Sequence, residues 1–264
     1  TNASRHVNPV LNEVLTVLAP SDDDNREDML SGLRSALNQA TVQLGGSVSK
    51  NIHVGDDYDI DIFIKFPLST NSLSDRLETA LNELSWTYER VQASRDYFIV
   101  SDGKHDYELV PVLNIDQPSQ AKSVIDVSPL HIDYFNNRAD DTTRDHVRLL
   151  KQFVKAHRIY GAESYINGFS GHVIDLLILA YGSFNDVLEA AQDWSPKTVI
   201  DIEEHHDTPM LTLNESKTHG PLIVVDPIQS ERNAAAAVNS AAYHEFIDAA
   251  KTFLDEPRGE AFTK

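Results

Sequence analysis

Apolar residues recur along most of this chain at the three- and four-residue spacing of amphipathic helices, and in one central stretch they follow the pattern of a strand. The helical spacing occupies residues 7–19 and 22–40, and it returns from about residue 142 to residue 158. The strand pattern begins with an alternation at Tyr58 and continues as an apolar run to Phe66. The pattern therefore predicts helices on either side of a buried central strand.

Shorter strand patterns come after the central one, at residues 87–93, 95–101 and 104–114. Asp102-Gly103 between the last two is typical of a two-residue hairpin turn. Beyond about residue 138 the pattern is mostly helical, with short strands and turns over residues 197–225. We therefore expect an α+β protein with two domains, residues 1–137 holding a mixed sheet and residues 138–264 being mainly helical.

Composition narrows the class of protein. The 264 residues contain no cysteine and no run of about 18 apolar residues, and the first ten lack the apolar centre of a secretory signal, so the cytoplasm is the expected compartment. The 41 acidic and 22 basic residues give a net charge of −19, which is unusual for a protein that binds nucleic acid. Either no polyanion binds, or the acidity is a general surface property, such as an adaptation to high salt, that spares local basic patches.

The most informative stretch for function runs from Gly45 to Pro67. Asp59 and Asp61 are two apart at the head of the central strand, so their carboxylates project from one face, where a hard cation such as Mg²⁺ would offset their repulsion. The preceding Gly45-Gly46-Ser47 turn allows backbone N–H groups to approach an anion. Together, the two features indicate a nucleoside triphosphate site, whereas either alone is more typical of a solvated strand end or a turn.

Basic residues concentrate on the helix predicted over residues 142–158. They succeed one another at spacings of four, three, four and three residues, which places them on one face: Arg144, Arg148, Lys151, Lys155 and Arg158. A solvated helix face would ordinarily mix charges of both signs. We therefore expect this stripe to contact a triphosphate or an RNA backbone, with a plain charged face as the alternative.

These motifs resemble the DNA polymerase β superfamily of nucleotidyltransferases, in which Gly-Ser precedes an acidic-x-Asp pair at the head of a strand. More narrowly, GGSVSKN, DIDIFIKFP and the segment over residues 144–184 resemble the archaeal (class I) CCA-adding enzymes. The resemblance extends over about residues 7–257. It implies a polymerase-β-like catalytic domain and, after it, a domain that recognises nucleotides.

The resemblance also implies roles for individual residues. Alignment on Val110-Pro111 puts Glu108, rather than Asp106, at the position of the third carboxylate, where the family has aspartate. Asp59, Asp61 and Glu108 would then bind two Mg²⁺ ions. The nucleotide-binding residues implied by the match are Gly46, Ser47, Lys50, His131, Lys151, Tyr160, Arg232 and Asn233, with Arg232 and Asn233 at the head of a helix and Arg232 on the base edge.

The implied activity is template-independent addition of C and A, from CTP and ATP, to the 3′ end of tRNA. The family's C-terminal body and tail regions, which grip the tRNA, have no counterpart in these 264 residues. The chain is therefore expected to be a truncated form, or a short relative whose acceptor is held by a partner or is not tRNA. The alternatives are a second-messenger synthase or tRNA-modifying toxin, a module that binds nucleotides or RNA without catalysis, and an interaction scaffold.

Overall fold

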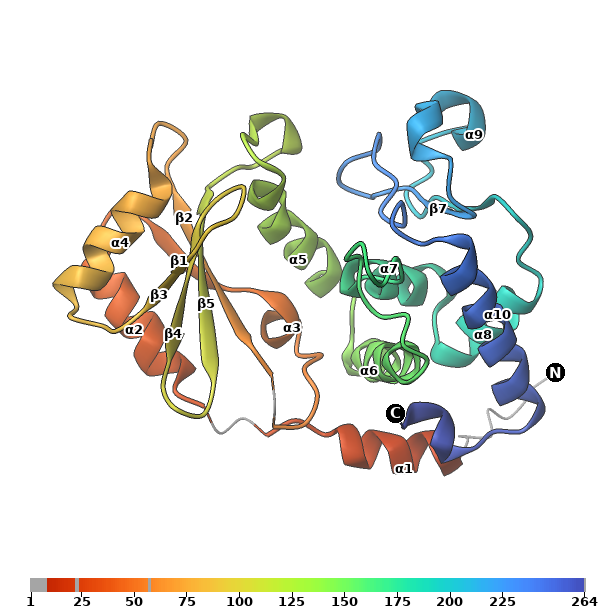
Figure 1. The fold of residues 1–264 in the computed structure, drawn as a ribbon. Helices are drawn as coiled ribbons and strands as arrows, with labels where there is room; N and C mark the ends of the chain where they lie inside the picture. The colour runs from red at the N-terminus through yellow and green to blue at the C-terminus, as the bar shows by residue number, and fades with distance from the viewer. Residues whose placement is uncertain (1–8, 22–23, 57, 264) are drawn as a thin grey trace. The chain divides into compact units, whose positions relative to one another are not determined.

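The computed structural model describes residues 9–21, 24–56 and 58–263, and it divides the chain into two compact units (Figure 1). One unit is Pro20–Asn137, and the other joins the described part of Thr1–Ala19 to Arg138–Lys264. The division after Asn137 falls where the sequence pattern changes. Residues 9–19 were expected in the first domain, but helix α1 (Pro9–Leu18) packs against α6 (Asp141–Ala156) and η4 (Gly259–Phe262), within the unit that contains Arg138–Lys264.

The unit Pro20–Asn137 is built on one five-stranded mixed sheet of order β1-β2-β5-β4-β3. Its strands are β1 (Thr41–Leu44), β2 (Ile60–Phe66), β3 (Glu89–Val91), β4 (Tyr97–Ser101) and β5 (Asp106–Leu113). β2 and β5 are parallel, and the other pairs are antiparallel. The predicted hairpin turn is longer than two residues, because Asp102 to His105 separate β4 from β5. This sheet and the helices on it confirm the α+β class.

Helices lie on both faces of this sheet (Figure 1). They are α2 (Arg26–Ala36), α3 (Gly46–Ser49), α4 (Leu73–Glu83), η1 (Pro118–Gln120), η2 (Val124–Val127) and α5 (Ser128–Asn136). On one face Ile60, Ile62 and Ile64 of β2 are completely buried. On the other, Ile132 of α5 packs with Phe63 and Val112. Burial on both faces explains why β2 reads as an almost continuous apolar run after its first residues.

The other unit is mainly helical, as the pattern predicted. Besides α1 it contains α6 (Asp141–Ala156), α7 (Gly171–Tyr181), α8 (Phe184–Gln192), β6 (Thr198–Ile200), α9 (Pro209–Thr212), η3 (Glu215–Lys217), β7 (Leu222–Val224), α10 (Ser240–Asp255) and η4 (Gly259–Phe262). Phe153 of α6 is surrounded by aromatic rings whose centroids lie 5.5–6.3 Å away, those of Phe184, Phe246, Phe253 and Phe262. These edge-on contacts join α6, α8, α10 and η4 into one core. Among the described residues, no helix has both the length and the apolarity needed to cross a membrane.

One buried carboxylate fixes α5 to the sheet. Asp126 is fully buried at the end of η2, where it forms an ion pair with Arg95 and accepts backbone N–H bonds from Leu113, Lys122 and Ser123. Burial, the largest influence on this group, favours the neutral acid, but the Arg95 guanidinium and the N–H groups outweigh it and lower the pKa of Asp126. Asp126 therefore ties the end of β5 and the β3–β4 connection to the segment that leads into α5.

We expect Asp126→Asn to lower the free energy of unfolding by about 3 kcal/mol, because it leaves the guanidinium of Arg95 in a mostly buried site without its counter-charge. Urea unfolding monitored by circular dichroism measures the loss. Asp75→Asn is the control, because Asp75 is an exposed partner of Arg90 and its removal should cost less than about 1 kcal/mol. Equal losses in the two variants would show that Asp126 has no special role.

Candidate active site

Two of the three predicted metal-binding carboxylates lie directly opposite each other in the sheet. The parallel register of β2 and β5 pairs Asp61 with Glu108, so both side chains leave the same face. Asp59 is exposed and lies just before β2, which begins at Ile60, two residues later than the predicted start at Tyr58. Asp106 begins β5, is exposed, and pairs with Ser101 of β4. The register therefore places Glu108, and not Asp106, beside Asp61.

The electrostatics of this cluster disfavour the ionised form of Glu108. Partial burial raises the pKa of Glu108, and the negative charges of Asp59 and Asp106 raise it further, while a hydrogen bond with Asp61 lowers it. Mg²⁺ prefers oxygen ligands, and its charge would offset the repulsion between neighbouring carboxylates. The donor set Asp59, Asp61 and Glu108 therefore fits a hard divalent cation.

The glycine pair is pressed against the same cluster. The N–H of Gly45 donates to the main-chain carbonyl of Asp61 at 2.7 Å. Gly46 has a φ of +55°, and a Cβ atom there would lie 1.7 Å from Oδ2 of Asp61. Only glycine fits at such a position. The predicted turn is in fact the start of the short helix α3, whose first turn contains Ser47.

Helix α5 holds the far end of α3. Asn136 donates its side-chain N–H to the carbonyl of Ser49 at 3.1 Å, and the ammonium of Lys50 lies 5.5 Å from the centre of the Phe135 ring. His131 lies on the same helix, next to Ile132 in the sequence, and is half-buried. Gly46 and Ser47 therefore belong to α3, Lys50 directly follows it, and His131 belongs to α5.

The predicted basic stripe is divided in the structure. Helix α6 ends at Ala156, and Arg158 lies beyond it with a φ of +60°, in a turn where the N–H of Ile159 donates to the carbonyl of Val154. Arg148 is only 8% exposed and pairs with Asp145 at 2.8 Å. Four of the five stripe residues therefore lie on α6, Arg148 among them is mostly buried, and Arg158 lies beyond the end of the helix.

Arg144 also has local roles at the start of α6. Its guanidinium donates to the carbonyl of Ala139 at 2.9 Å and lies 3.8 Å from the carboxylate of Asp141. Asp141 is the first residue of α6, so the helix begins with an acidic residue close to this arginine. Arg144 therefore helps to fix the first turn of the helix.

The last two lysines of α6 converge on one aromatic ring. The ammonium groups of Lys151 and Lys155 lie 5.6 and 5.1 Å from the centre of the Tyr160 ring. Tyr160 is held by a bridge to Phe169, beside which Gly168 approaches the carbonyl of Ile159 so closely that a Cβ atom would lie 2.0 Å from it. Two cations on one rigid tyrosine make a compact positive site that fits a phosphate chain.

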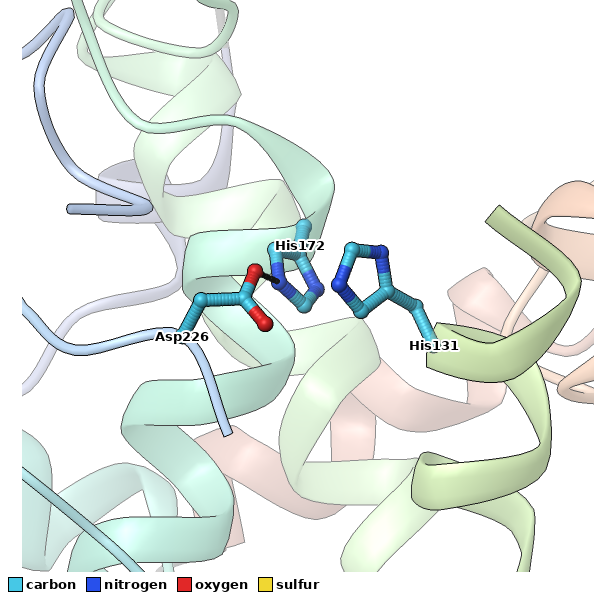
Figure 2. Close-up of side chains that lie close together, drawn as sticks. All are labelled: His131, His172 and Asp226. Carbon is cyan, nitrogen blue, oxygen red and sulfur yellow. Dashed lines mark hydrogen bonds and ion pairs between the residues drawn. The ribbon is translucent and has the colours of Figure 1, made fainter. Parts of the chain in front are cut away.

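A second polar centre surrounds the carboxylate of Asp226, which is completely buried. Its Oδ2 accepts from Arg232 at 3.2 Å and bonds Nε2 of His172 at 3.0 Å, the contact drawn in Figure 2. Asp226 therefore holds the Arg232 guanidinium in place. His172 was missed, because 54 residues separate it from Asp226 and no sequence spacing connects them.

Asn233 differs from its predicted role. It is buried, and both its amide hydrogens and its carbonyl oxygen are used by the backbone: it donates to Lys217 and Leu222 and accepts from Val224 and Ala235. An amide of this kind has no hydrogen-bonding capacity left for a base. Residues 232–233 also do not begin a helix, because turns come after them. Asn233 therefore fixes the backbone next to Arg232.

The comparisons with known proteins agree with this geometry. The model of the family described as tRNA nucleotidyltransferase, second domain, matches residues 145–263. The CCA-adding enzyme of Saccharolobus shibatae is 34% identical over 259 residues, which are 95% of this chain and 60% of that enzyme. The CCA-adding enzyme of Methanothermobacter thermautotrophicus is also 34% identical, over 94% of this chain and 57% of its own length.

This chain is similar to archaeal CCA-adding enzymes along most of its length. It spans about 60% of the length of the relatives that it matches. The fold agrees with a solved structure of the Cid1 poly(U) polymerase with Mg and 3′-dATP bound, at a TM-score of 0.71, 14% identity and coverage of 96% of this chain and 97% of that one. The polymerase-β-like nucleotidyltransferase fold of this chain is thereby confirmed.

We expect Glu108→Gln to stabilise the metal-free protein by about 0.2–1 kcal/mol at pH 8, because it removes a partly buried charge that lies close to the negative charges of Asp59 and Asp106. The raised pKa of Glu108 sets the sign: the cost is absent when the carboxyl is protonated at low pH, and it appears as the pH rises through the raised pKa. Thermal unfolding in a chelator at pH 8 and at about pH 4 measures the difference.

Asp106→Asn is the control, since that exposed carboxylate lies farther from Asp61 in the register and its removal should stabilise the protein less. Added Mg²⁺ should stabilise the unsubstituted protein more than Glu108→Gln, because only the former keeps all its ligands. Destabilisation by Glu108→Gln in the chelator would contradict the electrostatic account of the cluster.

Gly46→Ala should reduce nucleotidyl transfer by at least about 100-fold, because its methyl group would displace the carboxylate of Asp61. Gly55→Ala is a matched control: Gly55 has a similar φ of +63° but no atom within 4 Å of the added Cβ. Both variants should lose about 1 kcal/mol of stability to backbone strain, and only Gly46→Ala should lose activity. Equal activities would exclude a role for close packing against Asp61.

Proposed function

We propose that this chain is a metal-dependent nucleotidyltransferase that adds C and A, from CTP and ATP, to the 3′ end of tRNA. The observation that carries the proposal is the pairing of Asp61 with Glu108 across β2 and β5, with Asp59 two residues before Asp61 and Gly46 pressed against it. The CCA-adding enzymes that match along 95% of the chain support tRNA as the acceptor.

Asp59, Asp61 and Glu108 would hold two Mg²⁺ ions. When bound, these ions supply Lewis-acid chemistry: they lower the pKa of an attacking hydroxyl and neutralise charge on a leaving pyrophosphate. The carboxylates of this chain would determine where the ions lie relative to the attacking hydroxyl and the leaving pyrophosphate. In the transfer itself, the acceptor 3′ oxygen forms a bond to the α-phosphorus, the bond from that phosphorus to the bridging oxygen breaks, and pyrophosphate leaves.

The remaining predicted residues would bind the nucleotide. Ser47 and Lys50 offer a hydroxyl and an ammonium near the acidic cluster. In the other unit, Lys151 and Tyr160 offer a cation and a phenol that would bind phosphate. Lys155 joins this phosphate site, because it shares the ring of Tyr160. We do not assign Arg144, Arg148 or Asn233 to ligand binding, since their side chains have local partners.

Arg232 would read the base edge. Its side chain is 39% exposed, and its guanidinium is oriented by the buried carboxylate of Asp226, which His172 also contacts. A planar guanidinium held in this way offers donors in fixed directions, which suits the acceptor nitrogens that cytosine and adenine share. His172 would then position Arg232 through Asp226 rather than contact the substrate.

The test is transfer of labelled nucleotide from CTP or ATP, with Mg²⁺, to tRNA lacking its 3′ end and to an acceptor-stem minihelix, over a range of salt concentrations. We expect incorporation that Asp61→Asn reduces at least about 1,000-fold, because one ligand of the cation is lost. The exposed Asp116→Asn, away from the cluster, should keep full activity. Incorporation that persists in Asp61→Asn, or that does not need a divalent cation, would overturn the assignment.

A further inference from the structure

Two consecutive histidines hold the loop that presents Arg232, and neither is part of the machinery described above. We define the 226–232 loop as the segment from Asp226 to Arg232. His205 bonds the carbonyl of Pro227 at 2.9 Å, and His206 bonds the carbonyl of Ser230 at 2.6 Å, each through Nε2. A carbonyl only accepts, so both Nε2 atoms carry hydrogen.

The 226–232 loop is closed on itself, so that its outer carbonyls face the histidines. The N–H of Asp226 donates to the carbonyl of Arg232 at 2.9 Å, and the N–H of Arg232 donates to the carbonyl of Gln229 at 2.8 Å. Oδ1 of Asp226 accepts from the N–H groups of Ile228 and Gln229. These bonds fix the shape of the loop, and the two histidines fix its position.

The histidines are themselves held by a shaped segment between β6 and α9. The N–H of His206 donates to the carboxylate of Asp201 at 2.9 Å, and its Nδ1 bonds the hydroxyl of Thr212 at 2.8 Å. Glu204, just before the pair, has a φ of +52°, a conformation that costs stability in a residue other than glycine. Such strain persists only where the surrounding contacts require it, and here it turns the chain so that adjacent histidines reach one loop.

We propose that His205 and His206 are positioning residues for base selection, which act by fixing the 226–232 loop and with it the guanidinium of Arg232. The inference rests on the proposed function, because it assumes that Arg232 reads the base. A guanidinium discriminates between bases through the directions of its donors, and a loop free to shift would let those directions vary. The ligand concerned is the base of the incoming nucleoside triphosphate.

The experiment measures steady-state transfer of CTP, ATP, UTP and GTP to acceptor RNA by the full chain and by His206→Ala and His205→Ala. Loss of one hydrogen bond should raise the KM for CTP and ATP about five- to tenfold and reduce discrimination against UTP and GTP by a similar factor. The value of kcat should change less than about threefold, because the carboxylate cluster is untouched.

Two further variants separate positioning from general structure. His206→Gln should restore selectivity, because its amide nitrogen can replace Nε2 as donor to the carbonyl of Ser230. His244→Ala is the matched control, since this exposed histidine bonds Ser240 of its own helix α10. His205 is exposed, so His205→Ala keeps the test available if His206→Ala does not fold.

The outcomes distinguish the two proposals. If the unsubstituted chain transfers neither CTP nor ATP, the proposed function fails before any variant is considered. If that chain is active and the alanine variants keep its selectivity, or lose kcat equally with all four nucleotides, only the positioning role is overturned. A rise in KM with lost selectivity, rescued by His206→Gln, supports it.

Discussion

The arrangement of the acidic site depends on the parallel pairing of β2 with β5. A parallel pair of neighbouring strands needs a crossover connection, and here the intervening chain supplies α4, β3 and β4 before β5 returns beside β2. The pairing puts Asp61 opposite Glu108 and leaves their carboxylates on one face. Because a slip of one residue would send either side chain to the buried face, the apolar residues that fix the register also fix the carboxylate cluster.

Repulsion in this cluster is offset by rigid packing around it. Ile60, Ile62 and Ile64 anchor β2 on one face, while Phe63 packs with Ile132 of α5 on the other. Partial burial, and after it the negative charges of Asp59 and Asp106, raise the pKa of Glu108. Clusters of like charges that lower the stability of the fold are common at functional sites, because the chemistry there requires them.

Local sequence pattern was enough to predict the central features of the acidic site. The alternation at Asp59 and Asp61, the apolar core of β2 and the choice of Glu108 all rest on residues close together in the chain or on a family motif. The pattern did not predict the docking of α1 on α6 or the bond between His172 and Asp226, because both depend on residues brought together only by folding. The burial of Arg148 was missed for a related reason: periodicity identifies a helix face, but not the segments that cover it.

Because the chain is acidic, the positions of its few basic residues are informative about where an anion could bind. Several arginines serve local structure, as Arg95 does with Asp126 and Arg148 with Asp145. Lys151 and Lys155 instead share the ring of Tyr160, and Arg232 is aimed by a carboxylate that lies in the core. A net charge of −19 repels a polyanion at long range, but salt at about 0.1 M screens that repulsion at separations beyond about 10 Å. The contacts between a cation and a phosphate are much shorter than this distance and are screened less. Local placement of cations, more than net charge, therefore decides whether this protein can hold a triphosphate.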